Sequence, residues 1–415
     1  MEGIALTDED RAILALESAA VAGHTCKVVL IGAGAPTADD LRASISRRLE
    51  VAPALTRRLS GPLARPVWID DEGFDIEAHV VPVHVDPCDD AAMRAEVARL
   101  FGERLDRSRP LWRIDVIPRA AGVALVWRIH HALADGTMAM RLADEVLWDP
   151  DRDHSSAPRA AAHAGHAGHA GRHRRLGAFI RHEVALTSGR SPFDGTIGSD
   201  REVAFAGAPL RELHDAARQL ADASVNDAVL TVVAGALRAW IQHRHGRLGR
   251  LRVKIPVSLH DPTDGLANRD SFFTLELPLD EADPVARLAA VRAATAVRKA
   301  DHDAETLEAL LGDMARVSPQ LEHFCRRLEA SPRTFALNVS NVPGPARPVS
   351  VLGAPVEAAY SIAEIGERHA LRIAVVSLAG RLYFGFCADP SIVGDIDVLA
   401  RGVEAETAAL LAAAR

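Results

Sequence analysis

The stretch GVALVWRIHHALADGTMAMRLADEVL, residues 122–147, contains the change of pattern that decides the fold around it. Residues 123–127 are a continuous apolar run, which is typical of a buried strand, and the strand 123–129 is predicted to form a hairpin with residues 112–117. After Gly136 the apolar residues recur at helical spacing. Residues 130–135 therefore lie in a turn that joins a strand to a helix.

Two adjacent histidines, His130 and His131, stand at the start of this turn. An imidazole titrates near neutral pH and can take a proton from an alcohol, so a histidine suits the role of general base. Adjacent residues at a strand end point to opposite faces, which makes a shared role for the two rings unfavourable. We predict that His131 is the base and that His130 is a structural residue.

Asp135 and Gly136 close the turn. Asp135 is predicted to hold it, either by pairing with a cation or by capping the following helix through a side-chain oxygen. Gly136 permits close approach of backbone. Taken alone, the two histidines could equally be a zinc or core pair, but no cluster of further ligands at metal spacing accompanies them. No metal site is therefore predicted.

Other chemistries lack a signal in the sequence. The chain has no Gly-x-Ser-x-Gly elbow, no Gly-x-x-x-x-Gly-Lys loop and no Gly-x-Gly-x-x-Gly after a strand. Its four scattered cysteines form no CxxC pair, which indicates neither a zinc site nor a disulfide framework. Direct base catalysis without a bound cofactor is the chemistry that is left.

Composition and charge narrow the class of protein. The 415-residue chain has 48% hydrophobic and 25% charged residues, which is typical of a folded globular protein. A formal net charge of −8 gives no electrostatic reason to bind nucleic acid. The acidic start at residues 8–10 lacks the features of a secretory signal, and no apolar run approaches the length of a membrane span. We expect a cytoplasmic protein whose contact with lipid is peripheral.

The length predicts two domains. Residues 154–175 are mostly Ala, Gly, His and Arg, and such a segment buries too little surface to offset the entropy of ordering. We therefore place a linker at 151–202, between an N-terminal domain of residues 1–150 and a C-terminal domain of residues 203–415. Each domain is expected to mix helices and strands in an α+β fold, with a site at their interface.

The remaining elements follow from the same periodicities. A first helix starts at Thr7, and Asn226 is a candidate N-cap for a long later helix. Trp112 is a candidate buried anchor of the hairpin. The predicted strands are 27–31, 80–85, 252–257, 272–277, 335–340, 371–378 and 382–388, and the later helices are 225–244, 284–299 and 394–415.

The turn resembles the HHxxxDG motif of the coenzyme A-dependent acyltransferase superfamily, which includes chloramphenicol acetyltransferase and the condensation domains of peptide synthetases. Other segments narrow the resemblance to the bacterial wax ester synthase/diacylglycerol acyltransferase family, over a likeness that runs from about Leu6 to beyond Asp397. These segments are Pro66-Val67-Trp68, Phe74-Asp75, His79-Val80, Pro110-Leu111-Trp112, Val225-Asn226-Asp227, Pro256-Val257-Ser258-Leu259 and residues 338–345.

The resemblance implies two chloramphenicol-acetyltransferase-like domains with a tunnel between them. It implies an O-acyltransferase that moves a fatty acyl group from acyl-coenzyme A, a cosubstrate, to an alcohol or diacylglycerol hydroxyl. Asn226 and Asn341 become candidate substrate contacts, and peripheral contact with a membrane or lipid droplet is compatible with such acceptors. The family often has arginine where this chain has His260, which leaves the cation partner of Asp135 open.

Two alternatives to this function remain open. One is a related or condensation-type enzyme that acylates a hydroxyl or amine of a specialised metabolite. The other is a non-catalytic relative that binds a lipid or a thioester. The intact HHxxxDG motif argues against the second alternative.

Overall fold

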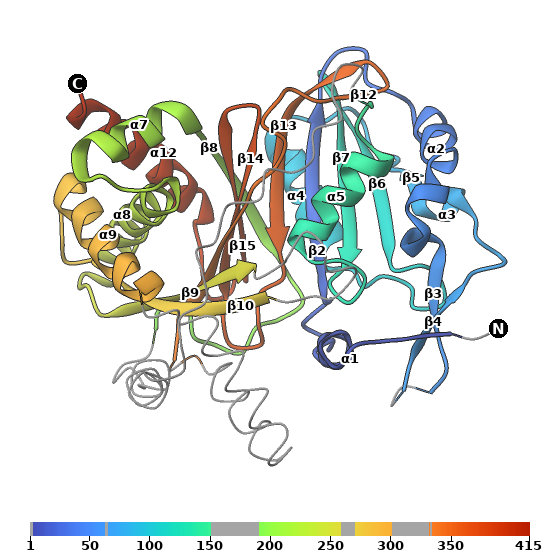
Figure 1. The fold of residues 1–415 in the computed structure, drawn as a ribbon, viewed down its shortest axis with the longest axis horizontal. Helices are drawn as coiled ribbons and strands as arrows, with labels where there is room; N and C mark the ends of the chain where they lie inside the picture. Colours follow the sequence, from blue (N-terminus) through green and yellow to red (C-terminus); the bar gives the residue numbers. More distant parts are fainter. Residues whose placement is uncertain (1–2, 63–64, 151–190, 259–269, 301–331, 333) are drawn as a thin grey trace. The chain divides into compact units, whose positions relative to one another are not determined.

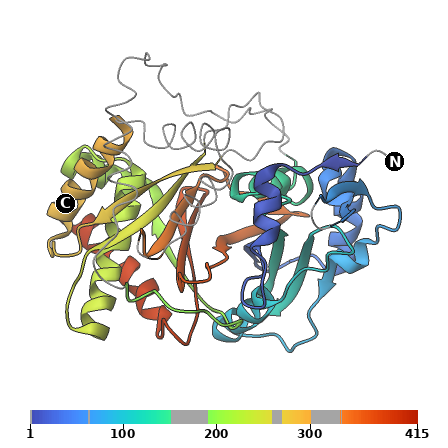
Figure 2. The same ribbon diagram turned by 90° about the horizontal axis from the view of Figure 1, so that it is seen from below.

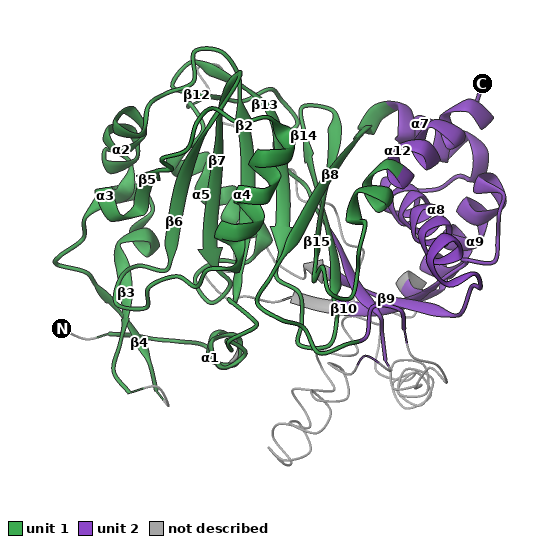
Figure 3. Ribbon diagram, turned by 180° about the vertical axis from the view of Figure 1, so that it is seen from behind, with its two compact units in different colours: residues 1–150, 195–211, 341–401 green, residues 151–194, 212–340, 402–415 purple. Residues whose placement is uncertain are grey.

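The structure is a computed structural model that describes the chain except for residues 1–2, 63–64, 151–190, 259–269, 301–331 and 333. The chain divides into two compact units (Figure 3). Most of the predicted linker lies outside the described residues, and the predicted domain boundaries stay a prediction, as does the tunnel. Unit 1 contains residues 1–150, 195–211 and 341–401, and unit 2 contains residues 151–194, 212–340 and 402–415.

A six-stranded sheet forms the centre of unit 1 (Figure 1). Its strand order is β12-β13-β2-β7-β6-β5, and all neighbours are antiparallel except β5 and β6, which are parallel. The strands are β2 (His24–Ile31), β5 (Val80–Pro82), β6 (Trp112–Arg119), β7 (Gly122–His130), β12 (Ser350–Val351) and β13 (Ala354–Ala363).

Helices cover both faces of this sheet. α5 (Gly136–Val146) lies over one face in Figure 1, and α4 (Asp90–Gly102) lies over the other face in the view from behind in Figure 3. On the α4 side, the rings of Phe101 and His24 meet edge to face at 4.8 Å. The remaining helical segments of unit 1 are α1 (Asp8–Ala15), α2 (Ala38–Ser46), η1 (Leu49–Val51), η2 (Pro53–Thr56) and α3 (Ile76–His79).

Two smaller groups of strands also belong to unit 1. The first is a three-stranded sheet of order β1-β4-β3. In the second, β15 pairs antiparallel with β14 on one side and with β8 on the other. The strands are β1 (Ile4–Ala5), β3 (Arg57–Ser60), β4 (Val67–Asp70), β8 (Glu202–Pro209), β14 (Leu371–Leu378) and β15 (Arg381–Ala388).

Unit 2 is built around the long helix α8, whose residues 227–237 are all buried. In Figure 2 the yellow strands β9 and β10 lie beside the helices α8 and α9. β9 pairs antiparallel with β10 and parallel with the start of β11. The elements are α7 (Leu210–Ala221), α8 (Val225–His245), β9 (Leu251–Ser258), β10 (Asp270–Leu277), α9 (Pro284–Ala300), β11 (Leu337–Val342) and α12 (Ile396–Ala413), of which α7, β11 and α12 each have one end in unit 1.

Within the described ranges, no single helix is long and apolar enough to cross a membrane. The pair formed by α7 and α8 meets the requirement by length and composition, but the chain bends by 92° at the break between them.

Most predicted elements are confirmed to within a few residues, including the hairpin of β6 and β7. The predicted strand 80–85 is shorter, since β5 ends at Pro82 and Val83 N adds one last hydrogen bond to β6, to Val116 O at 2.9 Å. The prediction of Asn226 as an N-cap was wrong. Ser224 caps α8 and forms a capping box with Asp227, whose Oδ2 accepts from Ser224 N at 2.8 Å.

Candidate active site

Backbone hydrogen bonds fix the turn that follows β7. Its own backbone closes through Leu133 N, which donates to His130 O at 2.9 Å. Its first residue also donates, from His130 N to Leu111 O at 2.9 Å, and the next residue donates from His131 N to Gly23 O at 3.0 Å. The backbone of the two motif histidines is therefore held by Leu111, which precedes β6, and by Gly23, which precedes β2. Both strands are neighbours of β7 in the sheet.

The His130 ring is engaged at both nitrogens. The residue is 1% exposed, and its Nδ1 accepts a hydrogen bond from Ala132 N at 3.0 Å. Its Nε2 lies 2.7 Å from Oε1 of Glu17. A ring with protein partners at both nitrogens has no position left for a substrate proton, which supports the predicted structural role.

The His131 ring differs in this respect. Its Nε2 is buried and forms no hydrogen bond with any residue that the structure describes. Burial, and then the charges of Arg372, His130 and Lys27, lower the pKa of His131 to about 3. The ring is therefore neutral at neutral pH and can accept a proton, although so low a pKa reduces the driving force for proton removal.

Lys27 on β2 is a buried cation near this turn. It is 4% exposed, and its Nζ donates to Ser361 Oγ at 2.8 Å. Burial lowers the pKa of Lys27 to about 8, against opposing contributions from Cys26 and from the charge of Asp135. The ammonium group is thus still mostly charged at pH 7, and Asp135 is an anion that favours this state.

Asp135 is the N-cap of α5. Its Oδ1 accepts a hydrogen bond from Met138 N at 2.6 Å, and the residue is 4% exposed. The geometry supports capping as a way of holding the turn, and the charge of Asp135 also opposes the lowering of the pKa of Lys27 by burial. His260 lies outside the described residues.

The end of β11 brings a second motif segment beside the turn. A Cβ added to Gly136 would lie 3.3 Å from Val342 Cγ2, and Val342 follows the half-buried Asn341. Gly344 approaches β14 closely, because a Cβ there would lie 2.3 Å from the backbone oxygen of Ser377. The structure thus brings Asn341 and Gly136 into one region of unit 1.

Two other motif residues have their own surroundings. Trp112 is 1% exposed and donates from Nε1 to Leu55 O at 2.7 Å, so the predicted buried anchor is confirmed. Asn226 lies half-buried in the first turn of α8, in unit 2. Its neighbour Asp227 is the buried residue of this motif, and its Oδ1 accepts from the hydroxyl of Thr295 at 2.6 Å.

Sequence reasoning missed Glu17, Gly23 and Lys27, which surround the turn in the folded protein. Lys27 directly precedes the apolar run 28–31 of β2, and a lysine beside such a run is a signal that could have been used. The contact of Glu17 with His130 has no local signal, because the two residues are distant in the chain.

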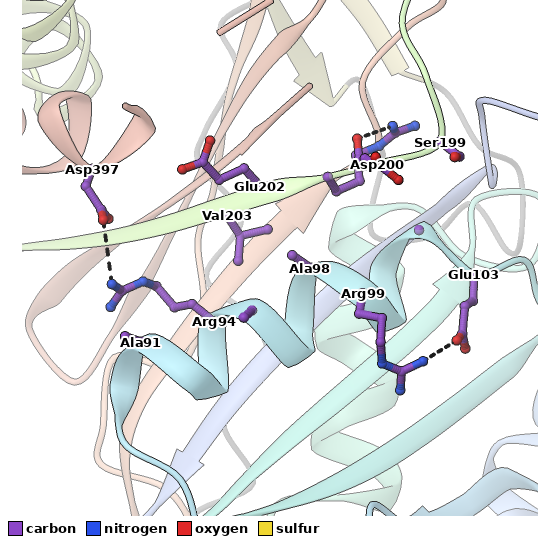
Figure 4. A pocket seen from close by; sticks show the side chains of 13 residues that line it. Ala91, Arg94, Ala98, Arg99, Glu103, Ser199, Asp200, Glu202, Val203 and Asp397 are labelled. Carbon is purple, nitrogen blue, oxygen red and sulfur yellow. Dashed lines mark hydrogen bonds and ion pairs between the residues drawn. The ribbon is translucent and has the colours of Figure 1, made fainter. Parts of the chain in front are cut away.

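A pocket of about 670 Å³ lies in unit 1 beside α4 and β8 (Figure 4). None of the predicted site residues lines it. Its cations are paired, since Arg94 contacts Asp397 at 3.7 Å and Arg99 contacts Glu103. We therefore do not assign it to the acyl transfer site.

In the described part of the chain, no group of three or more His, Cys, Asp or Glu residues could hold a metal ion.

Solved structures of other proteins share this fold. The wax ester synthase/diacylglycerol acyltransferase from Marinobacter aquaeolei VT8 is similar with a TM-score of 0.73 and 22% identity, over 99% of both chains. The starter condensation domain of rhizomide synthetase is similar with a TM-score of 0.62 and 15% identity, over 98% of this chain and 95% of that one. The predicted α+β, chloramphenicol-acetyltransferase-like fold is confirmed.

Sequence comparison identifies the family. Residues 6–188 match the wax ester synthase/diacylglycerol acyltransferase catalytic domain, and residues 266–410 match the C-terminal domain of the same family. A protein of Mycobacterium tuberculosis named probable diacylglycerol O-acyltransferase is 29% identical over 422 residues, which cover 93% of this chain and 90% of that protein. The chain belongs to the wax ester synthase/diacylglycerol acyltransferase family and is an acyltransferase that uses acyl-coenzyme A.

Proposed function

We propose that His131 is the general base with which this protein moves a fatty acyl group from acyl-coenzyme A to the hydroxyl of a long-chain alcohol or diacylglycerol. The observation that carries the proposal is the contrast between the two motif histidines. The Nε2 of His131 is buried and forms no hydrogen bond in the described part of the chain, whereas Nδ1 of His130 accepts from Ala132 N and its Nε2 lies 2.7 Å from the carboxylate of Glu17.

The reaction proceeds in one complex of both substrates. His131 removes the hydroxyl proton while the oxygen attacks the thioester carbonyl carbon, and the imidazolium then protonates the departing thiolate as the C–S bond breaks. No acyl-enzyme forms. Holding both substrates at one imidazole replaces a bimolecular encounter by a local one, and hydrogen-bond donors near the carbonyl oxygen would stabilise the tetrahedral charge.

The surrounding residues have supporting roles in this proposal. Asp135 and His130 hold the turn, Gly136 gives backbone access, and Asn226 and Asn341 contact substrate. Acyl-coenzyme A is a cosubstrate, and the protein needs no further cofactor or metal.

A cytoplasmic protein that touches a membrane or a lipid droplet fits these substrates. Both proposed acceptors are lipids, which favours peripheral contact with a lipid surface.

Release of free thiol from palmitoyl-coenzyme A tests the proposal. We expect release that depends on added hexadecanol or diacylglycerol, formation of the matching ester, and loss of both with His131→Ala. Transfer to an amine or a small polar hydroxyl, without ester formation from lipid acceptors, would favour an enzyme of specialised metabolism. Binding of palmitoyl-coenzyme A without transfer to any acceptor would identify a non-catalytic relative.

A further inference from the structure

Glu17 follows α1 and reaches the first motif histidine. Its Oε1 lies 2.7 Å from Nε2 of His130, and both side chains are nearly inaccessible, at 8% and 1% exposed. α1 is held at this place by packing, because Leu14 of α1 and Ala132 of the turn share one buried hydrophobic cluster. The contact therefore joins the N-terminal helix to the turn that carries the proposed base.

The contacts of the His130 ring with Ala132 and Glu17 together determine which ring nitrogen carries the proton. Nδ1 accepts from Ala132 N at 3.0 Å and so has no hydrogen of its own. The ring proton is then on Nε2, which lies 2.7 Å from Oε1 of the Glu17 carboxylate. The opposite tautomer would place two N–H groups face to face at Ala132 and would leave Nε2 as a lone pair against an anion.

Arg107 holds Glu17 in position. Its Nη2 lies 3.0 Å from Oε2 of Glu17 and also donates to Leu14 O at 3.0 Å. Burial by itself would raise the pKa of Glu17, but the hydrogen bonds and charges of His130 and Arg107 outweigh burial and lower it. Glu17 is thus an anion at neutral pH, fixed between a guanidinium and an imidazole.

Gly23 leaves room for this arrangement. Its φ is +76°, and a Cβ there would lie 2.7 Å from Nε2 of His130 and 3.0 Å from Cγ of Glu17. Its carbonyl oxygen is also the acceptor for His131 N. One glycine therefore borders both motif histidines.

We infer that Glu17, anchored by Arg107, is a positioning residue for the acyl transfer reaction, which acts by holding His130 in one tautomer so that the turn presents His131 to the substrates. The inference rests on the proposed function of His131. Glu17 touches neither substrate nor the reacting atoms in this scheme, so its removal should affect turnover and leave substrate affinity unchanged.

The test measures steady-state kinetics and the ¹⁵N spectrum of the histidine rings. Glu17→Ala should lower kcat by about 10- to 100-fold, which is the size expected for a displaced catalytic group, with an unchanged KM for palmitoyl-coenzyme A. Glu17→Gln keeps an acceptor for His130 but loses the anion beside Arg107, so its kcat should lie between those of Glu17→Ala and wild type. The His130 signals, assigned by their loss in His130→Gln, should show an unprotonated Nδ1 in wild type and a mixture of tautomers in Glu17→Ala.

Gly34 provides a matched control for Gly23. It has a φ of +79°, but a Cβ there would meet nothing within 4 Å. Both Gly23→Ala and Gly34→Ala introduce the same backbone strain, and only Gly23→Ala should lower kcat and disturb the His130 signals. Wild-type kcat in folded Glu17→Ala, or a proton on Nδ1 of His130 in the wild-type spectrum, would overturn the inference. Failure of the proposed function would show differently, as a wild-type protein that transfers no acyl group while its His130 spectrum is as expected.

Discussion

Replacement of Asp135 separates its two roles, because one substitution removes only its charge and another removes both its charge and its cap. Asp135→Asn keeps an oxygen that can accept from Met138 N, the bond that measures 2.6 Å in the structure, but it removes the negative charge that acts on Lys27. Asp135→Ala removes both. The two variants should therefore differ in the free energy of unfolding by the value of the cap.

The structure sets an upper limit on the charge effect. The pKa of Lys27 is about 8, so at pH 7 the lysine can release its proton for about 1.4 kcal/mol if its anionic neighbour is removed. Loss of the charge interaction with Lys27 should thus contribute no more than about 1.4 kcal/mol to the cost of Asp135→Asn at pH 7. Asp135→Ala should cost about 0.5–2 kcal/mol more, which is the range for a lost N-cap.

The two costs also differ in their dependence on pH. Since Lys27 is neutral in the folded protein above its pKa of about 8, the penalty of Asp135→Asn should fade as the pH rises through that value. The penalty of Asp135→Ala should keep its capping part. Urea denaturation at about pH 7 and about pH 9 measures both, and the matched controls are Asp89→Asn and Asp89→Ala, at an exposed N-cap whose Oδ1 accepts from Ala92 N at 2.8 Å.

Turnover should follow the geometry of the turn. Asp135→Asn should keep a good part of the activity, while Asp135→Ala should lose about 100-fold, because a displaced base costs about that much. The Asp89 variants should not change turnover. An Asn variant that is as unstable as the Ala variant at both pH values would show that capping is not the role of Asp135, and a stable but inactive Ala variant would contradict both structural roles.

Three further predictions test the proposed base, its charge environment and the linker. His131→Ala should lower turnover by about 10²- to 10⁴-fold at an unchanged melting temperature, whereas His130→Ala should lower both; a folded, inactive His130 variant beside a fully active His131 variant would reverse the assignment. In wild type, kcat/KM should stay constant from about pH 8 down to about pH 5, because the active neutral form of His131 is lost only as the pH falls through its pKa of about 3. Lys27→Met removes one of the charges that lower this pKa, so the acid-side loss of kcat/KM should begin at a higher pH. An acid limb in wild type near the ordinary histidine pKa of about 6.5 would contradict the geometry. Replacement of residues 154–175, which lie outside the described residues, by a Gly/Ser segment of equal length should leave turnover nearly unchanged, and we expect chelator to have no effect on wild type. A large loss in either experiment would mean that the histidines of this segment bind metal or gate the site.

Local sequence was sufficient for the elements that depend on near neighbours. The apolar run of β7 predicts a buried strand and the spacing after Gly136 predicts α5, because both signals lie within a few residues. β8 and β13 were not predicted. Their sequences, EVAFAGAP and APVEAAYSIA, are rich in alanine and lack a strong alternation, so their strand state depends on pairing with β15 and β2.

The sequence by itself determined the class of fold, the family and the motif that supplies the proposed base, because these depend on short segments whose residues stand next to one another. Only the tertiary structure decided what surrounds that base. Lys27 meets Ser361 across 334 residues of chain, and Glu17 meets His130 through the packing of α1. Such contacts arise when distant strands pair and a helix packs on a turn, and no local propensity encodes them. The charge and the tautomer at the motif histidines are therefore properties of the folded chain.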